Sequence, residues 1–286
     1  MAWIMKRTAF AVFLLLVCHL CCWRDAYAEI KLGILPRLNA VELFGMFNPV
    51  AEYLSRETGE KVSIVIPKDF DAFKAAVRAG QIDLGFCNSL IYVQIRKTLP
   101  IELLALSSEM KSGSKFRGII IVRRDSPIKK VSDLKGKKLI FVEKDSAGGY
   151  LFQQLLLKKA GLDISKDVTL LPFAKKHDNV TQAVYNGVAD AGGIREDDLP
   201  KMKNKVNLAN IRIIASSDPY PNWPMFATPG LNAEKARKIK DALLKLKVGD
   251  PNTARVLKAA KLDGFVPVAD KDYDSLREAA RLVGAY

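Results

Sequence analysis

The stretch FVEKDSAGGYLFQQLLLKKAG, residues 141–161, joins an apolar segment to a helical pattern through a turn of small residues. The apolar run LIFV (139–142) predicts a strand, and the periodicity that follows predicts a helix over 149–160. A strand, a small-residue turn and a helix start present free backbone N–H groups, which can hold an anion. Ordinary α/β connections look the same, so the stretch predicts an α/β fold and leaves open what the turn holds.

The same alternation of strand and helix patterns extends along the chain. The predicted strands are 30–35, 62–66, 82–86, 101–106, 118–122, 139–142, 168–172, 189–194 and 211–215. The predicted helices are 40–58, 70–79, 89–97, 149–160, 177–186, 233–247, 252–260 and 270–282. This order predicts two α/β lobes, each an open, mainly parallel sheet with helices on both faces.

Residues 1–28 have the three parts of a secretory signal peptide. Lys6 and Arg7 form the basic start, 8–18 (TAFAVFLLLVC) the apolar run, and 26–28 (AYA) the cleavage site. We therefore expect cleavage after Ala28 and a periplasmic location. A retained membrane anchor is the alternative, but the apolar run is shorter than the ~20 residues of a spanning helix.

Removal of the signal peptide would leave Cys87 as the only cysteine and His177 as the only histidine. These counts rule out an intramolecular disulfide and most metal sites built from several His or Cys ligands. Residues 29–286 contain no HExxH, CxxC, EF-hand or Walker motif and no evident nucleophile–base pair. We therefore predict no metal, no cofactor and no catalytic activity.

The chain is strongly basic, with a net charge of +14. Residues 1–28 carry three basic residues and one acidic residue, a net +2, so +12 remains after cleavage. The densest cluster, KKVSDLKGKK (129–138), has no aromatic residues to stack on bases. It is interpreted as a solvated face, so we predict no nucleic-acid partner and a charge that steers anions toward the protein.

Four stretches, in order, resemble the phosphonate/phosphite/phosphate-binding proteins of ABC transporters. They are 32–66 (LGILPRLNAVELFG…), 69–93 (DFDAFKAAVRAGQIDLGFCNSLIYV), 116–150 (FRGIIIVRRDSPIKKVSDLKGKKLIFVEKDSAGGY) and 177–194 (HDNVTQAVYNGVADAGGI). The resemblance implies a two-lobed type II periplasmic binding fold with a two-strand hinge, crossed near Ile121 and Ser216. Lobe 1 would comprise 29–121 and 217–286, and lobe 2 would comprise 122–216. Closure about the hinge would bury a ligand between the lobes.

The resemblance also implies a ligand loop at the DSAGGY turn, where the family usually reads SSTSGY. Ser146 keeps one hydroxyl of that motif and Tyr150 ends it, whereas Ala147 and Gly148 replace hydroxyl residues. The backbone N–H groups of Ala147, Gly148 and Gly149 would remain to hold an anion. A plain helix cap without a ligand is the alternative.

Other candidates follow other strands. His177 matches a family histidine that contacts the ligand, and a helix-capping or surface histidine is the alternative. Asn88 and Ser89 stand at a helix start, where N-capping explains them nearly as well. Arg37, just after the first strand, would supply positive charge to the ligand or face solvent.

Three acidic residues complete the candidates. Asp145 would cap the helix or, if it faced the cleft, repel a dianion. Glu196 and Asp218 lie in turns where the family places further contacts, and solvated loops are the alternative.

The leading hypothesis is a monomeric periplasmic protein that captures a small phosphonate-, phosphite- or phosphate-like oxyanion and delivers it to the membrane permease of an ABC transporter. The alternative is an extracytoplasmic ligand-sensing or partner-interaction module of the same fold, with a changed ligand and a membrane receptor as its partner.

Overall fold

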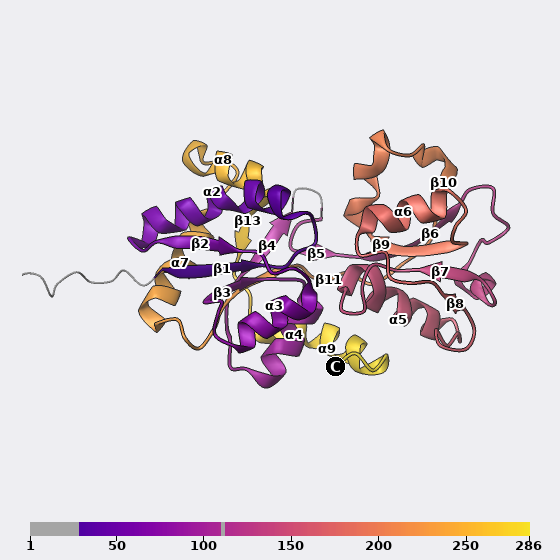
Figure 1. Ribbon diagram of the computed structural model, residues 1–286, viewed down its shortest axis with the longest axis horizontal. Coiled ribbons are helices and arrows are strands. Elements are labelled where there is room, and N and C mark those ends of the chain that lie inside the picture. Colours follow the sequence, from indigo (N-terminus) through magenta and orange to yellow (C-terminus); the bar gives the residue numbers. More distant parts are fainter. Residues whose placement is uncertain (1–28, 110–111) are drawn as a thin grey trace, which may run out of the picture.

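The computed structural model describes residues 29–109 and 112–286, and the predicted signal peptide lies outside them. Two sheets lie side by side, joined by two short strands (Figure 1). The two-lobed α/β architecture is confirmed. Both sheets are mixed, because some strands run against the parallel ones.

The first sheet has the order β13-β4-β12-β3-β1-β2. Its strands are β1 (Ile30–Ile34), β2 (Val62–Val65), β3 (Leu84–Phe86), β4 (Glu102–Glu109), β12 (Pro224–Ala227) and β13 (Leu262–Val266). β1 pairs parallel with β2 and β3, whereas β12 and β13 run antiparallel to their neighbours. β12 and β13 were not predicted from the sequence, and both are short strands of the returning chain.

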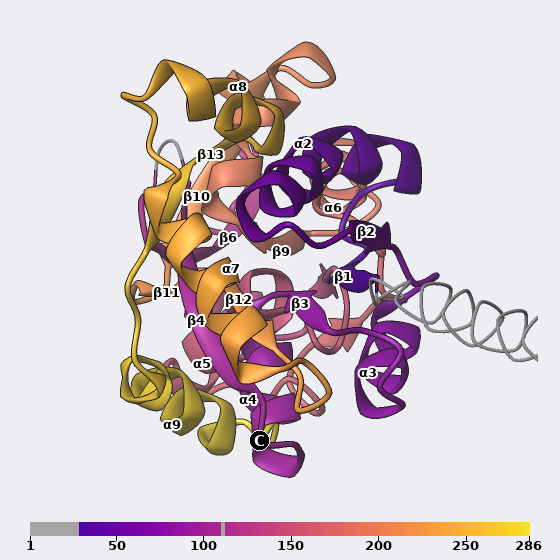
Figure 2. The same cartoon turned by 90° about the vertical axis from the view of Figure 1, so that its left-hand side faces the viewer.

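Helices cover both faces of the first sheet. They are α2 (Ala40–Thr58), α3 (Phe70–Arg78), α4 (Ser89–Thr98), α7 (Ala233–Lys245), α8 (Pro251–Ala260) and α9 (Asp274–Leu282). α2 and α8 lie on one side of the strands, and α3, α4 and α9 on the other (Figures 1 and 2). α2 has the predicted bounds because Asn39 caps its first turn and Gly59 takes a left-handed conformation (φ 74°) at its end.

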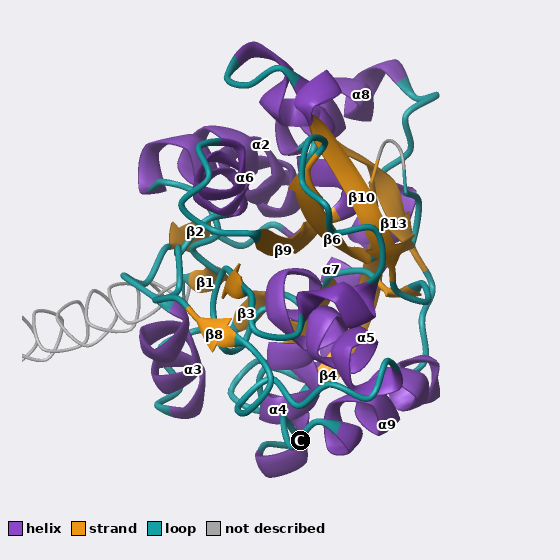
Figure 3. Cartoon of the chain, turned by 90° about the vertical axis from the view of Figure 1, so that its right-hand side faces the viewer, coloured by secondary structure: helices purple, strands orange, loops and turns teal. Residues whose placement is uncertain are grey.

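The second sheet has the order β10-β6-β9-β7-β8. Its strands are β6 (Gly118–Arg123), β7 (Lys138–Ile140), β8 (Thr169–Leu170), β9 (Ala191–Arg195) and β10 (Ile211–Ser216). α6 (His177–Tyr185) covers one side, and η2 (Ala147–Leu151) with α5 (Phe152–Lys159) covers the other (Figure 3). The remaining short helices are η1 (Val131–Leu134), η3 (Glu196–Asp198), η4 (Pro200–Asn204), η5 (Leu208–Asn210) and η6 (Asp270–Tyr273).

The chain crosses between the sheets twice, through β5 (Lys115–Phe116) and β11 (Tyr220–Pro221), which pair antiparallel. The second crossing follows Ser216, the last residue of β10, close to where we predicted it. The first crossing comes earlier than the predicted Ile121. Gly118 already pairs with Arg195 of β9, because GIIIV forms one continuous buried central strand. The second sheet therefore begins at Gly118 and not at Val122.

Candidate functional site

A small cavity of about 20 Å³ lies between the two sheets, beside the crossing strands. The lining residues are Arg37, Phe70, Asn88, Phe116, Val142, Ser146, Ala147, Gly148, Lys175, His177, Arg195, Asp198 and Trp223. They come from loops and helix starts beside the first sheet, from segments of the second sheet and from the crossing strand β5. This volume is only slightly larger than the volume that one water molecule needs. The arrangement therefore suits a compact ligand.

The first turn of η2 forms one wall of the cavity. Ser146 is the N-cap, and its Oγ accepts a hydrogen bond from the N–H of Gly149 at 3.1 Å. Ala147 and Gly148, both buried, belong to the first turn, where backbone N–H groups have no partner in a preceding turn. These two N–H groups and the positive end of the helix form a site for an anion.

Gly148 is a glycine because its surroundings leave no space for a side chain. A Cβ at this position would lie 2.9 Å from the ring of Phe116 and 3.2 Å from the Cβ of Arg195. Gly149 would likewise meet Val142 at 2.4 Å. Gly148 therefore lets the turn pack closely against β9 and the crossing strand, and Gly149 lets it pack against Val142.

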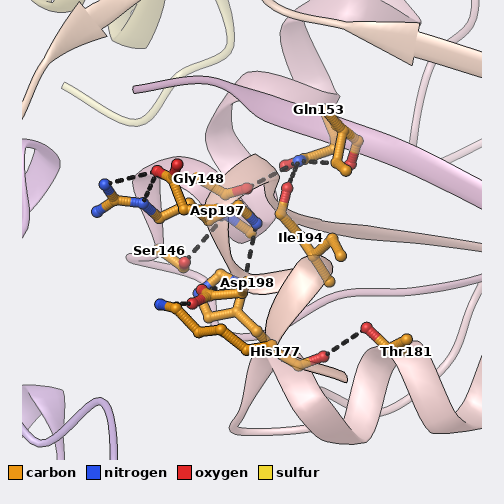
Figure 4. Close-up of polar contacts among 12 residues, drawn as sticks. Ser146, Gly148, Gln153, His177, Thr181, Ile194, Asp197 and Asp198 are labelled. Carbon is orange, nitrogen blue, oxygen red and sulfur yellow. Dashed lines mark hydrogen bonds and ion pairs between the residues drawn. The ribbon is translucent and has the colours of Figure 1, made fainter. Parts of the chain in front are cut away.

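The side chain of Gln153 holds this turn through hydrogen bonds to backbone carbonyls, as Figure 4 shows. Its Nε2 lies within hydrogen-bond distance of three backbone carbonyls, those of Gly148 (2.8 Å), Ile119 (3.1 Å) and Ile194 (3.1 Å). The side chain is fully buried. Gln153 thus connects the helix start to β6 and β9, a role that was not predicted from the sequence. Its only sequence signal is an amide on the inward face of an amphipathic helix.

His177 stands at the start of α6 in the cavity wall. Its Nδ1 accepts a hydrogen bond from the backbone N–H of Arg195 at 3.1 Å. Burial lowers the pKa of His177, although the nearby Asp198 carboxylate acts in the opposite direction. The imidazole is therefore neutral near neutral pH, with its proton on Nε2 as a hydrogen-bond donor.

Arg195 is a buried arginine that joins the two halves. Its guanidinium pairs with Glu109 of β4 at 3.0 Å and with Asp197 at 2.9 Å, and lies 4.4 Å from the ring centre of Phe116. Two carboxylates thus neutralise this cation. Arg195 therefore supports the site through its backbone N–H and its packing.

Arg37 brings a second guanidinium to the cavity. It lies 5.2 Å from the ring centre of Trp223, and its buried Nε has no hydrogen-bond partner among the described residues. Such contact with an aromatic face is favourable for a guanidinium. Unlike Arg195, Arg37 forms no ion pair with a carboxylate of the described residues, so its charge is available to a ligand.

Residues 32–273 match the family model described as "ABC transporter, phosphonate, periplasmic substrate-binding protein". The chain belongs to this family of phosphonate-binding periplasmic proteins. Substrate-binding proteins of ABC transporters have a small-molecule ligand and a membrane permease as their expected partners. Within residues 29–109 and 112–286, no helix is long and apolar enough to cross a membrane.

Individual relatives of this phosphonate-binding family member agree with that assignment. The phosphate-import protein PhnD of Mycolicibacterium smegmatis is 26% identical over 278 residues, covering 90% of this chain and 86% of its own length. The structure of PhnD1 from Prochlorococcus marinus in complex with methylphosphonate has a TM-score of 0.81 at 20% identity, covering 91% of this chain and all of that one. The tetrathionate sensor kinase TtrS of Salmonella typhimurium is 24% identical over 83% of this chain but only 42% of the kinase.

Of four further candidates in this phosphonate-binding protein, only Asn88 lines the cavity. Asn88 lines the cavity, caps α4 by accepting from the N–H of Ile91 (3.0 Å), and donates to the carbonyl of Asp145 (3.0 Å). Ser89 is buried and Tyr150 half-buried, and neither lines the cavity. Gly149 does not line the cavity either, and its N–H donates to Oγ of Ser146.

The acidic candidates lie elsewhere than expected. Glu196 is exposed, and Asp218 is exposed and paired with Lys159 at 2.9 Å, so neither reaches the cavity. η3 turns Asp198 inward instead, two residues beyond Glu196. Asp145 neither caps the helix nor faces the cavity, because Ser146 is the cap and the Asp145 carboxylate pairs with Lys74.

Proposed function

We propose that this protein binds a small phosphorus oxyanion, such as a phosphonate, phosphite or phosphate, in the cavity between its lobes and delivers it to the permease of an ABC transporter. One observation carries the proposal. The first-turn N–H groups of Ala147 and Gly148, the neutral imidazole of His177 and the unpaired guanidinium of Arg37 surround one small cavity. All are hydrogen-bond donors, and an oxyanion offers only acceptors or one additional proton.

The altered DSAGG loop is compatible with this ligand class. The hydroxyls that the family pattern provides are missing at Ala147 and Gly148, but their backbone N–H groups remain. The carboxylate of Asp145, which would repel an anion, is turned away and paired with Lys74. Backbone donors would therefore replace the lost hydroxyls.

Binding would be coupled to closure of two lobes. We assign 29–114 and 222–286 to lobe 1, 118–216 to lobe 2, and the paired strands β5 and β11 to the hinge. The cavity walls come from both lobes, so opening about the hinge would separate Arg37 from Gly148 and admit water. Closure would enclose the ligand in a site of low dielectric, where each hydrogen bond to it is stronger.

The same proposal includes export, a monomeric state and the absence of catalytic activity. Residues 1–28 would act as a signal peptide cleaved after Ala28, and the mature chain would work in the periplasm as a monomer without a cofactor. Capture and release of an anion need no reaction, and the cavity wall contains donors without a paired nucleophile.

A second candidate is a ligand-sensing module that acts on a membrane receptor. The match to part of the tetrathionate sensor kinase TtrS supports it. The two candidates differ in their partner. Co-purification with an ABC permease supports transport, whereas co-purification with a receptor kinase supports sensing.

Titration calorimetry on residues 29–286 at low salt tests the ligand class, with phosphite, phosphate, methylphosphonate and sulfate as probes. Ala147→Pro removes one first-turn N–H, and proline is tolerated here because Ser146 is extended (φ −86°, ψ 115°) and Ala147 is the first helical residue. We expect about 10- to 100-fold weaker binding, since a hydrogen bond to a charged group contributes about 1.5–3 kcal/mol.

The matched control is Ala233→Pro, the same change at the exposed first position of α7. It should leave the affinity unchanged. The proposal is wrong if no phosphorus oxyanion binds, or if the folded Ala147→Pro variant binds as well as the control.

A further inference from the structure

One carboxylate in the cavity wall has an oxygen that lacks a donor. Asp198 is only 8% exposed, and its Oδ1 accepts from the ammonium of Lys201 at 2.6 Å. Its Oδ2 lies 3.7 Å from Nδ1 of His177. That nitrogen already accepts from the N–H of Arg195, so it presents no proton to Oδ2. Within the described chain, no group donates to Asp198 Oδ2. Asp198 lines the cavity and lies beside His177 (Figure 4).

The groups facing Asp198 come from four elements. They are His177 of α6, Lys201 of η4, Arg37 of the loop after β1, and Arg195 of β9. Burial alone would raise the pKa of Asp198, but the positive charges around it, those of Lys201, Arg37 and Arg195 among them, lower it overall. The carboxylate is therefore ionised near neutral pH. An ionised acceptor in a cavity wall takes its donor from water, and a ligand that displaces this water must supply a donor in its place.

We propose that Asp198 selects the protonated form of the ligand: its Oδ2 accepts a hydrogen bond from a P–OH group, so the protein binds the monoanion of a phosphorus oxyanion and rejects dianions, sulfate and sulfonates. This inference rests on the proposed function and names the ligand class more narrowly. A ligand without a proton would place an oxygen lone pair against Oδ2, which repels it.

The carboxylate and the two backbone donors share one small cavity. Ala147, Gly148 and Asp198 line the same space of about 20 Å³, so a tetrahedral anion held by the two N–H groups would lie beside the carboxylate. The site thus holds donors on one side and an acceptor on the other. This pattern matches an oxyanion that carries one proton.

The charges of the wall and of its ion-pair partners leave no excess positive charge for a dianion. Lys175 pairs with Glu143 at 2.8 Å and Lys201 with Asp198, so both pairs are neutral, whereas Arg195 has two carboxylate partners. Arg37, which has no carboxylate partner in the described part of the chain, offsets the second of these carboxylates. A site that is neutral as a whole opposes a doubly charged ligand more than a singly charged one.

The test compares methylphosphonate with methanesulfonate by titration calorimetry at constant ionic strength, from about pH 6 to about pH 9. The methylphosphonate monoanion and methanesulfonate share their shape and charge and differ in one P–OH proton. We expect methanesulfonate to bind at least about tenfold more weakly at the lowest pH, since the acceptor is left unpaired. Above the second pKa of the probe, affinity for methylphosphonate should fall about tenfold per pH unit, with the monoanion fraction. Methanesulfonate does not titrate, so it reports any titration of the protein.

Asp198→Asn provides the matching variant, because an amide N–H donates to an unprotonated oxygen. It should bind methanesulfonate at least about tenfold more tightly than the wild type and lose the fall of methylphosphonate affinity with pH. Asp218→Asn, an exposed aspartate outside the cavity, is the control and should behave as the wild type.

Three outcomes would overturn the inference while leaving the proposed function intact. The first is equal affinity for methylphosphonate and methanesulfonate, and the second is an affinity for methylphosphonate that rises with pH. The third is an affinity for 2-aminoethylphosphonate that does not fall as the pH rises, which would place the ammonium of that ligand at Asp198. If no phosphorus oxyanion binds at any pH, the proposed function itself is wrong, and the inference with it.

Discussion

Lys74 and Asp145 form an ion pair that joins the two halves of the protein beside the cavity. Lys74 belongs to α3, and Asp145 directly precedes Ser146, the cap of the anion-binding turn. Gln94 of α4 donates to the other carboxylate oxygen of Asp145 at 3.2 Å, and Asn88 donates to its carbonyl. The loop that presents the ligand's N–H donors is therefore fastened to the opposite half.

Lys74→Met should weaken binding of the oxyanion about 3- to 10-fold at low salt. The variant breaks a largely buried ion pair and leaves the Asp145 charge close to the ligand loop. The difference should shrink in high salt, which screens charges that are not fully buried. Calorimetry at two ionic strengths measures it. Lys238→Met, which breaks an exposed pair with Glu234 on α7, should have no effect. Equal affinities of the two variants would contradict a role in closure.

Gln153→Met should lower the free energy of unfolding by about 2 kcal/mol or more and weaken binding as well. The methionine keeps the length of the side chain but leaves the buried carbonyls of Gly148, Ile119 and Ile194 without their shared donor. Urea unfolding and calorimetry measure the two effects. Gln154→Met, one position along the helix and partly exposed, should change neither. A stable Gln153→Met variant with full affinity would contradict the positioning of the turn by Gln153.

The free energy of unfolding should decrease as the pH falls below about 6.5, the ordinary pKa of histidine. The pKa of His177 is lowered in the folded state, so the unfolded chain takes up the proton first and acid favours unfolding. The slope is at most about 1.4 kcal/mol per pH unit. His177 is the only histidine in residues 29–286, so His177→Gln should lose this dependence between about pH 6.5 and about pH 5. Thermal unfolding at both pH values tests it, and a wild type equally stable at both would contradict a buried neutral imidazole.

Cys87 should not react with thiol reagents in the native protein. It is fully buried, and burial raises the pKa of its thiol well above the ordinary value. Colourimetric titration should detect the thiol of residues 29–286 only after unfolding, and non-reducing gels should show a single chain. Rapid labelling of the native protein, or a disulfide-linked dimer, would contradict this and the monomeric state.

The sequence predicted the elements with strong local signals. α2 has the predicted bounds because its cap Asn39 and its terminating Gly59 are local features. β12 and β13 were missed because they are short and depend on pairing with β4, far away in the sequence. The first crossing was misplaced because a continuous apolar run does not reveal where the chain changes sheets.

The candidate site was predicted in part for the same reason. Ala147, Gly148 and His177 were found from a turn and a helix start, which are local patterns. Asp198 was missed in favour of Glu196, since only the rotation of the short helix η3 decides which acidic side chain turns inward. The neutralisation of Asp145 by Lys74 joins residues 71 positions apart, which no local pattern contains.

The central claim is that the cavity holds a phosphorus oxyanion, and Trp223 reports on it directly. Trp223 lines the cavity beside Arg37 and is the only tryptophan in residues 29–286. Titration of this fragment with methylphosphonate, phosphite and phosphate should change the Trp223 fluorescence saturably for at least one probe, in Ala233→Pro as in the wild type, and far more weakly in Ala147→Pro. No change with any of these anions, or the same titration curve for Ala147→Pro, would contradict the claim.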